Sequence, residues 1–177
     1  GPGPLSQRLQ DLEDAGVVVR VMLPEPARVV VYDLTEWGHG LEAVNTALAL
    51  WAVSSPRLPL EADMSPDTLV LAMRAHARPL PDSAGECRVA LGLSDSRHPD
   101  RDRVDYVATM TVAGTTVTKG VEPGPVAAEV YATTRAWKAC VIGGVPLADA
   151  PDVAIVGDPA AARALLDATR LALPDVH

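Results

Sequence analysis

The feature that most constrains the fold is a break about a third of the way along the chain. The segment SSPRLPLEADMSPD, residues 54–67, holds three prolines among serine and aspartate residues. Proline fixes φ and has no amide donor, so neither a helix interior nor a strand interior runs through such a segment. We therefore predict two domains in the 177-residue chain, residues 1–57 and residues 65–177.

The first domain begins with an amphipathic helix. Leu5, Leu9 and Leu12 recur at steps of four and three, which places them on one helix face. Gly16 follows where a helix-ending glycine belongs, and a valine-rich run at 17–22 predicts a strand. The leucine face needs a packing partner. We expect preceding helices of a helix-turn-helix to supply it, so that the N-terminal part of this domain is incomplete here.

A hairpin and a second helix complete the first domain. The run at 29–34 predicts a strand that pairs with the first, because prolines bar the connection between them from a sheet interior. Thr35 is placed to cap the next helix. Apolar residues along that helix recur at steps of four, three, four and three, a stripe typical of helices that pack lengthwise on other helices. They are Trp37, Leu41, Val44, Leu48 and Trp51.

Residues 4–55 resemble the winged-helix portion of HxlR-type transcriptional regulators. The resemblance rests on the patterns L-S-x-R-L-x-x-L-E-x-x-G and Y-x-L-T-x-x-G-x-x-L, a proline-containing wing tip, and a tryptophan that closes the last helix. It implies that the first helix is the recognition helix of a homodimeric protein that binds double-stranded DNA.

The resemblance also predicts which residues contact DNA. With the leucines facing inward, Ser6, Gln7 and Gln10 lie on the outer face, near the helix end that enters the major groove. Gln can pair with adenine, and Ser can bond a phosphate or a base edge. Arg20 and Arg28 flank the wing and are expected to meet phosphates. The alternative is that these are ordinary surface polar residues.

Charge argues against indiscriminate attraction to nucleic acid. The chain carries a net charge of −8; residues 1–57 hold four Lys+Arg against seven Asp+Glu, which gives 4 − 7 = −3. DNA binding then depends on a few placed basic residues. Arg8 is predicted to lean toward the buried flank of the first helix, where pairing with an acidic neighbour competes with DNA contact.

The second domain is predicted to be α+β, with a mostly antiparallel sheet covered by helices. A helix over 65–77 begins at Ser65 and Pro66, and a closing helix that runs to about residue 173 begins at Asp158 and Pro159. Between them, β-branched runs predict strands at 86–93, at 104–120 with a turn at 113–114, and just before Asp158. The segment 128–144 is ambiguous, and its β-branched and aromatic content favours one or two strands.

Residues 65–173 are similar to the sterol carrier protein-like domain that follows the winged helix in some HxlR-type regulators. The segments SPDTLVLAMRAHA and PDVAIVGDPAAARALL carry this likeness. It implies a five-stranded sheet, helices over an apolar cavity, and a hydrophobic small-molecule effector. Candidate lining residues are Leu69, Met73, Met110 and Trp137, because Met is adaptable and Trp offers a large surface. The alternative is that all four are plain core.

Catalytic and metal-binding patterns are absent from the sequence. The four histidines show no metal spacing, there is no nucleotide fingerprint, and the two cysteines lie outside the winged helix. We expect no enzyme activity, no cofactor and no metal. Charged residues at 21% and the lack of an apolar run near twenty residues favour a cytoplasmic protein without a membrane partner.

Taken together, these patterns predict a ligand-responsive transcriptional regulator. One alternative is a carrier for an apolar metabolite, with the winged helix as a dimerisation scaffold. Another is an enzyme that uses the cavity as its active site.

Overall fold

The computed structural model describes residues 3–26, 28–52, 55, 62–81, 85–120 and 124–171. It divides into two compact units, residues 1–47 and residues 48–177. The division falls ahead of the proline-rich segment, of which residues 54 and 56–61 lie outside the described residues. Each unit is described here by itself.

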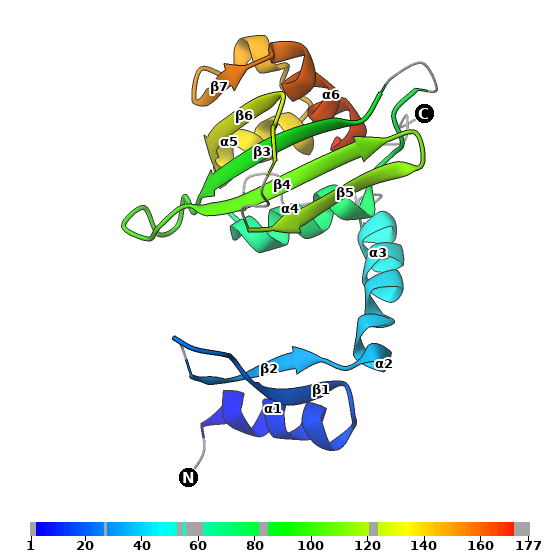
Figure 1. Ribbon diagram of the computed structural model, residues 1–177, viewed down its shortest axis with the longest axis vertical. Helices are drawn as coiled ribbons and strands as arrows, with labels where there is room; N and C mark the ends of the chain where they lie inside the picture. The colour runs from blue at the N-terminus through cyan, green and yellow to red at the C-terminus, as the bar shows by residue number, and fades with distance from the viewer. Residues whose placement is uncertain are drawn as a thin grey trace. The chain divides into compact units, whose positions relative to one another are not determined.

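The first unit contains the helix and the hairpin that the sequence predicts (Figure 1). Its elements are α1 (Pro4–Asp14), β1 (Val18–Met22), β2 (Val30–Leu34), α2 (Glu36–His39) and the start of α3 (Leu41–Ala52). Strands β1 and β2 pair antiparallel, with Arg20 opposite Tyr32. Gly16 adopts φ +73°, and the next amide, that of Val17, donates to Leu12 O at 2.9 Å, so the expected helix end is confirmed.

Thr35 ties the end of α1 to the start of α2. Its Oγ1 accepts from the amide of Gly38 at 3.0 Å, as a capping residue does, and donates to Gly16 O at 2.7 Å. Gly38 is buried, and a Cβ there would lie 2.1 Å from Val17 O. Only glycine fits this contact, which explains the glycine of the Y-x-L-T-x-x-G pattern.

The second helix of this region differs from the prediction. A single helix from Trp37 to Trp51 is wrong, because the structure has a four-residue helix, α2, then Gly40, then α3. The amide of Gly40 donates to Trp37 O at 3.1 Å, which closes a tighter turn than the α-helical one. The apolar stripe therefore continues across a local irregularity.

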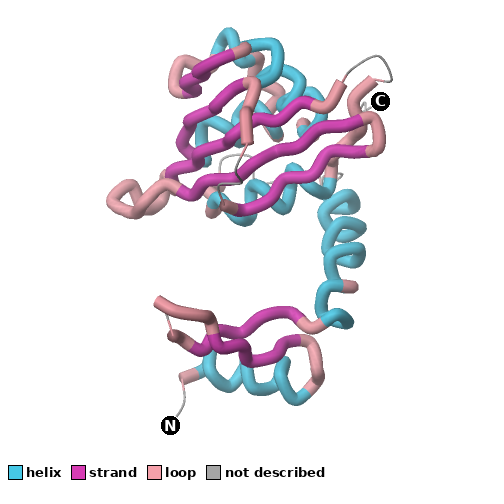
Figure 2. Tube along the Cα trace, in the orientation of Figure 1, coloured by secondary structure: helices cyan, strands magenta, loops and turns pink. Residues whose placement is uncertain are grey.

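The second unit is a five-stranded sheet with helices on one face (Figure 2). Strand order is β5-β4-β3-β6-β7, and every pair is antiparallel except β3 with β6. The predicted mixed helix-and-sheet class is confirmed. The elements are α4 (Pro66–Ala75), β3 (Cys87–Ser94), β4 (Val104–Thr111), β5 (Gly114–Lys119), β6 (Ala128–Thr133), α5 (Thr134–Val141), the 3₁₀ turn η1 (Leu147–Asp149), β7 (Val153–Gly157) and α6 (Pro159–Thr169).

Residues 128–144 correct a second prediction. The composition of this segment favours one or two strands, but only β6 is extended, and α5 begins directly after it. Thr133 Oγ1 accepts from the amide of Ala136 at 3.1 Å and so caps the helix. Trp137, Cys140 and Val141 then share one buried helical face. Their spacing of three and four indicates a helix, a signal that the β-branched composition concealed.

Helix ends elsewhere in this unit follow the predicted caps. Ser65 Oγ accepts from the amide of Thr68 at 3.1 Å, and Asp158 Oδ1 accepts from that of Ala160 at 2.8 Å. Helix α6 ends at Thr169, where Arg170 turns extended, so the predicted end near residue 173 is wrong by about four residues.

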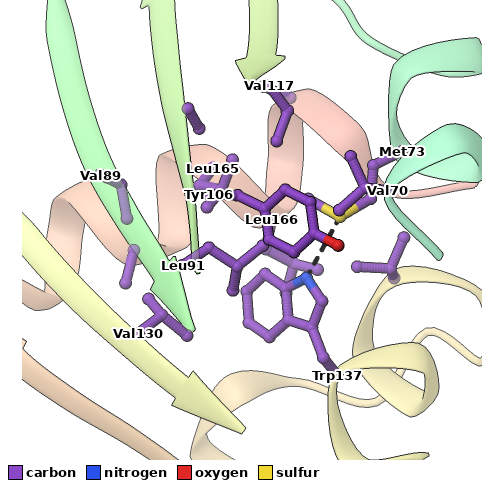
Figure 3. Close-up of a cluster of buried hydrophobic side chains, with 14 of the residues drawn as sticks. Val70, Met73, Val89, Leu91, Tyr106, Val117, Val130, Trp137, Leu165 and Leu166 are labelled. Carbon is purple, nitrogen blue, oxygen red and sulfur yellow. Dashed lines mark hydrogen bonds between the residues drawn. The ribbon is translucent and has the colours of Figure 1, made fainter. Parts of the chain in front are cut away.

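The core lies between the sheet and its three helices. Alternate residues of the strands, such as Val89 and Leu91 on β3, meet Met73 of α4, Trp137 of α5 and Leu165 of α6 (Figure 3). All five side chains are 0% exposed, and Trp137 Nε1 points at Met73 Sδ at 3.4 Å. These side chains belong to one buried hydrophobic cluster, whose removal from water stabilises the second unit.

Candidate nucleic-acid interface and ligand sites

The N-terminal half of α1 presents polar side chains to solvent. Ser6 and Gln7 are exposed, as the DNA-reading assignment requires. Gln7 Nε2 donates to Asp11 Oδ1 one turn later at 3.1 Å, which orients the amide along the helix. Gly3 precedes the helix without a side-chain cap, and Pro4 stands at its start. The free amides of this end are donors that suit a phosphate.

Gln10 and Arg20, predicted as separate DNA contacts, lie together. Arg20 Nη2 donates to Gln10 Oε1 at 2.8 Å, and Arg20 Nε lies 3.0 Å from Glu13 Oε2. The same guanidinium also contacts Tyr32. Arg20 Nε donates to the Tyr32 hydroxyl at 3.1 Å, and Arg20 Cζ lies 5.3 Å from the centroid of the Tyr32 ring. This cluster joins α1 to the hairpin, so both residues already have partners within the protein.

Arg28 stands apart, on the connection between the two strands. Its Nη2 lies 2.7 Å from Glu25 Oε1, and both side chains are largely exposed. Its φ is +39°, uncommon for a residue with a side chain. Exposure at the wing is what contact with a phosphate requires, and the glutamate screens only part of the charge.

Arg8 is a residue that sequence reasoning placed differently. It was expected on the buried flank of α1, but its side chain is 83% exposed, and its nearest carboxylate, that of Asp11, lies 3.7 Å away. Leu5 on the same flank is also exposed, which explains the difference. Ser6, Gln7 and Arg8 are three consecutive exposed polar residues in the first half of this helix; we call them the reading triplet.

The four predicted ligand-lining residues of the second unit are part of its core. Each side chain is 0% exposed. Three cavities of 260, 360 and 220 Å³ open on the surface of this unit, and none of the four lines any of them. Their role toward a ligand stays a prediction. The four are Leu69, Met73, Met110 and Trp137.

A buried tyrosine links the core to the start of α4. Tyr106 is 1% exposed, and its hydroxyl donates to Asp67 Oδ1 at 2.6 Å, while Lys119 Nζ donates to Asp67 Oδ2 at 2.8 Å. Burial, and then the bond to Asp67, raise the pKa of Tyr106 above its usual value. The tyrosine therefore stays protonated at any physiological pH and acts as a donor.

Hydrogen bonds from two basic residues of α5 fix the segment before α4; we call this group the polar clasp. Arg135 donates to Asp63 through Nε at 3.1 Å and Nη2 at 2.6 Å, and the buried Lys138 donates to Ala62 O. The bond from Arg135 is the main cause that lowers the pKa of Asp63, against desolvation. Ser96 adds a longer bond to Asp63, at 3.4 Å. Within the second unit, the segment before α4 is thus anchored from residue 62 onward.

Groups with metal-binding or nucleophilic chemistry are dispersed. Among the described residues no cluster of three or more His, Cys, Asp or Glu has the proximity to hold a metal ion. Burial raises the pKa of both Cys87 and Cys140, with Asp158 adding to the effect on Cys87. Both are therefore neutral thiols at neutral pH. The described helices include none long and apolar enough to cross a bilayer.

Comparison with known proteins matches the first unit. Residues 3–57 fit the family model of the HxlR-like helix-turn-helix. Over 48 residues the chain is 44% identical to the HTH-type transcriptional regulator YodB of Bacillus subtilis (strain 168), a stretch that covers 27% of this chain and 43% of YodB. The chain thus spans less than half the length of that relative. Both likenesses support an HxlR-type helix-turn-helix regulator.

Solved structures share a more general likeness with the chain. The stereoselective inverting sec-alkylsulfatase Pisa1 from Pseudomonas sp. has a TM-score of 0.48 at 14% identity, over 61% of this chain and 17% of that enzyme. A double mutant of the same sulfatase has a TM-score of 0.46 at 14% identity, over the same shares of both chains.

Proposed function

We propose that this protein is a DNA-binding transcriptional regulator that acts as a homodimer and responds to a hydrophobic small molecule through its second unit. The observation that carries the proposal is the helix-turn-helix match over residues 3–57. Within those residues α1 is followed by a hairpin, the order of recognition helix and wing. No catalytic role is assigned to the chain.

The reading triplet supports base recognition by α1. Ser6 and Gln7 supply hydrogen-bonding groups for base edges or phosphates, and Arg8 supplies a mobile cation. Gln10 and Arg20 act instead as positioning residues, because their bond to each other fixes α1 against β1. Arg28 on the wing adds a phosphate contact beside the helix.

Exposed apolar residues after the hairpin support a homodimer. Trp37 is 70% exposed and Trp51 is 74% exposed, and the stripe between them is exposed as well. Such a row of large side chains is covered in most proteins by a partner. A second copy of the same stripe, packed lengthwise, would bury it. The stripe comprises Trp37, Leu41, Val44, Leu48 and Trp51.

The proposed response to a ligand is a shift between two populations of the dimer. A ligand changes DNA affinity only if it binds one arrangement of the two recognition helices more tightly than the other. The boundary between the two units lies within helix α3 (Leu41–Ala52), and the bonds from Arg135 to Asp63 anchor the segment before α4 within the second unit. Both lie on the covalent path that such a change would follow.

The test begins with selection of bound duplexes from a random-sequence DNA pool by the full-length protein. We expect one enriched sequence. Gln7→Ala should weaken binding to it by about 1–3 kcal/mol while leaving non-specific binding unchanged. Arg8→Ala should weaken binding to all sequences and reduce the salt dependence. Arg101→Ala, an exposed arginine of the second unit, is the matched control and should change neither.

The acidic charge favours a second candidate, a carrier for an apolar metabolite. With a net charge of −8 and three acidic residues in the last turn of α1, non-specific attraction to DNA is weak. A carrier would enrich no sequence in the selection, and its affinity for DNA would be the same for Gln7→Ala and the unaltered protein. These two results together would contradict the regulator function and favour the carrier function.

A further inference from the structure

We infer that the cavity between α6 and the turn after α5 binds a small amphipathic monoanion, an apolar molecule bearing one carboxylate. The inference deepens the ligand-sensing part of the proposed function and rests on it for its biological meaning. Binding itself is a property of the second unit alone.

The cavity forms where the chain reverses after α5. Gly144 adopts φ +74°, and the amide of Val145 donates to Ala139 O at 3.0 Å, so the segment up to η1 folds back beside the helix. The amide of Leu171 donates to Val141 O at 2.7 Å, which ties the end of α6 to the end of α5. Between them lies a cavity of 220 Å³.

The inner wall of the cavity is apolar. It is formed by Cys140 and Leu166, which belong to the buried core, and by Val145 and Leu147, which are half-buried against it. The Cys140 thiol is neutral, because burial raises its pKa. Such a wall suits a short hydrocarbon and offers nothing to a fully hydrated ion.

The rim of the cavity carries an excess of positive charge. Arg163 and Arg170 line it from α6, with Asp167 between them. Arg170 Nη1 lies 3.6 Å from Asp167 Oδ1, a loose pair, and Arg78 Nη2 donates to Asp167 O and Arg170 O at 3.0 and 2.7 Å. The lining of the cavity therefore carries two guanidinium groups against one carboxylate, in a chain whose net charge is −8.

Arg163 is the group that points to a ligand. It is exposed at the rim, and no carboxylate or carbonyl among the described residues pairs with it. Two other arginines of this unit have close carboxylates, Arg97 with Asp95 at 2.8 Å and Arg103 with Asp105 at 2.7 Å. An arginine left open beside an apolar wall fits a carboxylate, which its planar fork bonds at two points.

Asp167 limits the charge of the ligand. Its carboxylate lies within the same rim, so a dianion such as a phosphate monoester would meet repulsion that a carboxylate meets only half as strongly. A neutral molecule would use the apolar wall but leave Arg163 without a partner. The combination of wall and rim therefore selects a monoanion with an apolar body.

Octanoate and 1-octanol are the probes that test this site. They have the same chain length and differ in charge, and titration calorimetry on the full-length protein without DNA measures both. We expect octanoate to bind at one site, at least tenfold more tightly than octanol. Arg163→Ala should lower the affinity for octanoate at least tenfold and leave the affinity for octanol unchanged. Arg163→Lys should bind octanoate with an affinity between those of Arg163→Ala and the unaltered protein. Arg101→Ala is the control and should match the unaltered protein.

Two further results complete the test. Val145→Asp, which places a negative charge on the wall, should abolish binding of both probes, with an unchanged circular dichroism spectrum as the check on folding. Equal affinity for octanoate and octanol, no binding of octanoate, or octanoate binding that survives Arg163→Ala would each overturn the assignment. Because DNA is absent, these results are independent of the selection experiment that tests the regulator.

Discussion

The two units differ in where their large apolar side chains lie. In the second unit Trp137, Leu165 and Met110 are 0% exposed within one cluster. In the first, Val18 is the only large apolar residue among those described that is buried, while Leu5, Trp37 and Leu41 face solvent. The second unit contains its own core, whereas the first is held by backbone pairing and polar contacts. The comparison shows that the sheet and helices of the second unit enclose a core of their own, whereas the described large apolar side chains of the first unit, Val18 apart, stay at least partly exposed.

The largest expected effect is on the free energy of unfolding, and it distinguishes a buried tryptophan of the second unit from an exposed one of the first. Trp137→Ala removes a fully buried side chain that contacts Met73, and we expect it to lower the free energy of unfolding by about 3–5 kcal/mol. Trp37→Ala, at an exposed position, should change it by less than about 0.5 kcal/mol in the dissociated protein. Urea unfolding of both variants at low protein concentration measures the difference. Similar losses for both would break the comparison.

Trp37→Ala should act instead on self-association. If the exposed stripe is the dimer surface, the variant dissociates at a higher concentration than the unaltered protein, because the lost aromatic is an interface anchor. Sedimentation velocity over a range of concentrations gives the dissociation constant. Val156→Ala removes an exposed apolar residue of β7 outside the stripe and is the control that should leave association unchanged.

A smaller effect is expected from the tyrosine at the edge of the core. Tyr106→Phe removes the hydroxyl that donates to Asp67 and should cost about 1–2 kcal/mol at neutral pH, because the charged carboxylate loses one donor but keeps Lys119 and water. Tyr32→Phe, half-buried in the first unit, should cost less than about 1 kcal/mol. Thermal or urea unfolding compares the two. A larger loss from Tyr32→Phe would reverse the ranking of the units.

The same tyrosine gives the second unit a pH dependence. Its pKa is raised in the folded protein, so the folded state holds the proton more tightly than the unfolded chain, whose tyrosine titrates near 10.0. The contribution of Tyr106 is fully present below pH 10 and is lost as pH rises further. The difference in stability between the unaltered protein and Tyr106→Phe should therefore shrink above pH 10. A difference that stays constant up to pH 11.5 or grows would contradict the assignment.

The smallest expected effect concerns the polar contacts of the first unit. Arg20→Ala removes the bonds to Gln10, Glu13 and Tyr32, and it should cost no more than about 1 kcal/mol because these groups remain accessible to water. Hydrogen exchange of the α1 amides should nevertheless accelerate. Arg8→Ala on the same helix has only a 3.7 Å pair to lose and should leave exchange unchanged. Equal exchange rates of the α1 amides in the unaltered protein, Arg20→Ala and Arg8→Ala would mean that the contacts of Arg20 do not fix α1 to the hairpin.

Local signals in the sequence predicted most of the fold. Caps at Thr35, Ser65 and Asp158 and the glycine turn at Gly16 are short-range features, and the structure has each of them. Residues 128–144 failed because β-branched content outweighed spacing, so the helix that carries Trp137 was missed. Composition is a weaker guide than periodicity where strand and helix adjoin.

The candidate sites were less predictable, because they depend on which side chains find partners. Gln10 and Arg20 are ten residues apart in sequence, and the chain reversal at Gly16 between α1 and β1 brings them together. Arg163 resembles any helix-surface arginine in the sequence, and its open position appears only once the turn after α5 is in place. Buried methionine and tryptophan give the same pattern whether they line a cavity or fill a core.

Footprinting of the selected duplex by the full-length protein tests the central claim most directly. A homodimer that reads DNA with α1 should protect two half-sites related by two-fold symmetry, spaced by about one helical turn or a multiple of it. Gln7→Ala should abolish that protection at the same concentration. A single unsymmetrical footprint, or protection that is unchanged in Gln7→Ala, would contradict the assignment of α1 as the recognition helix.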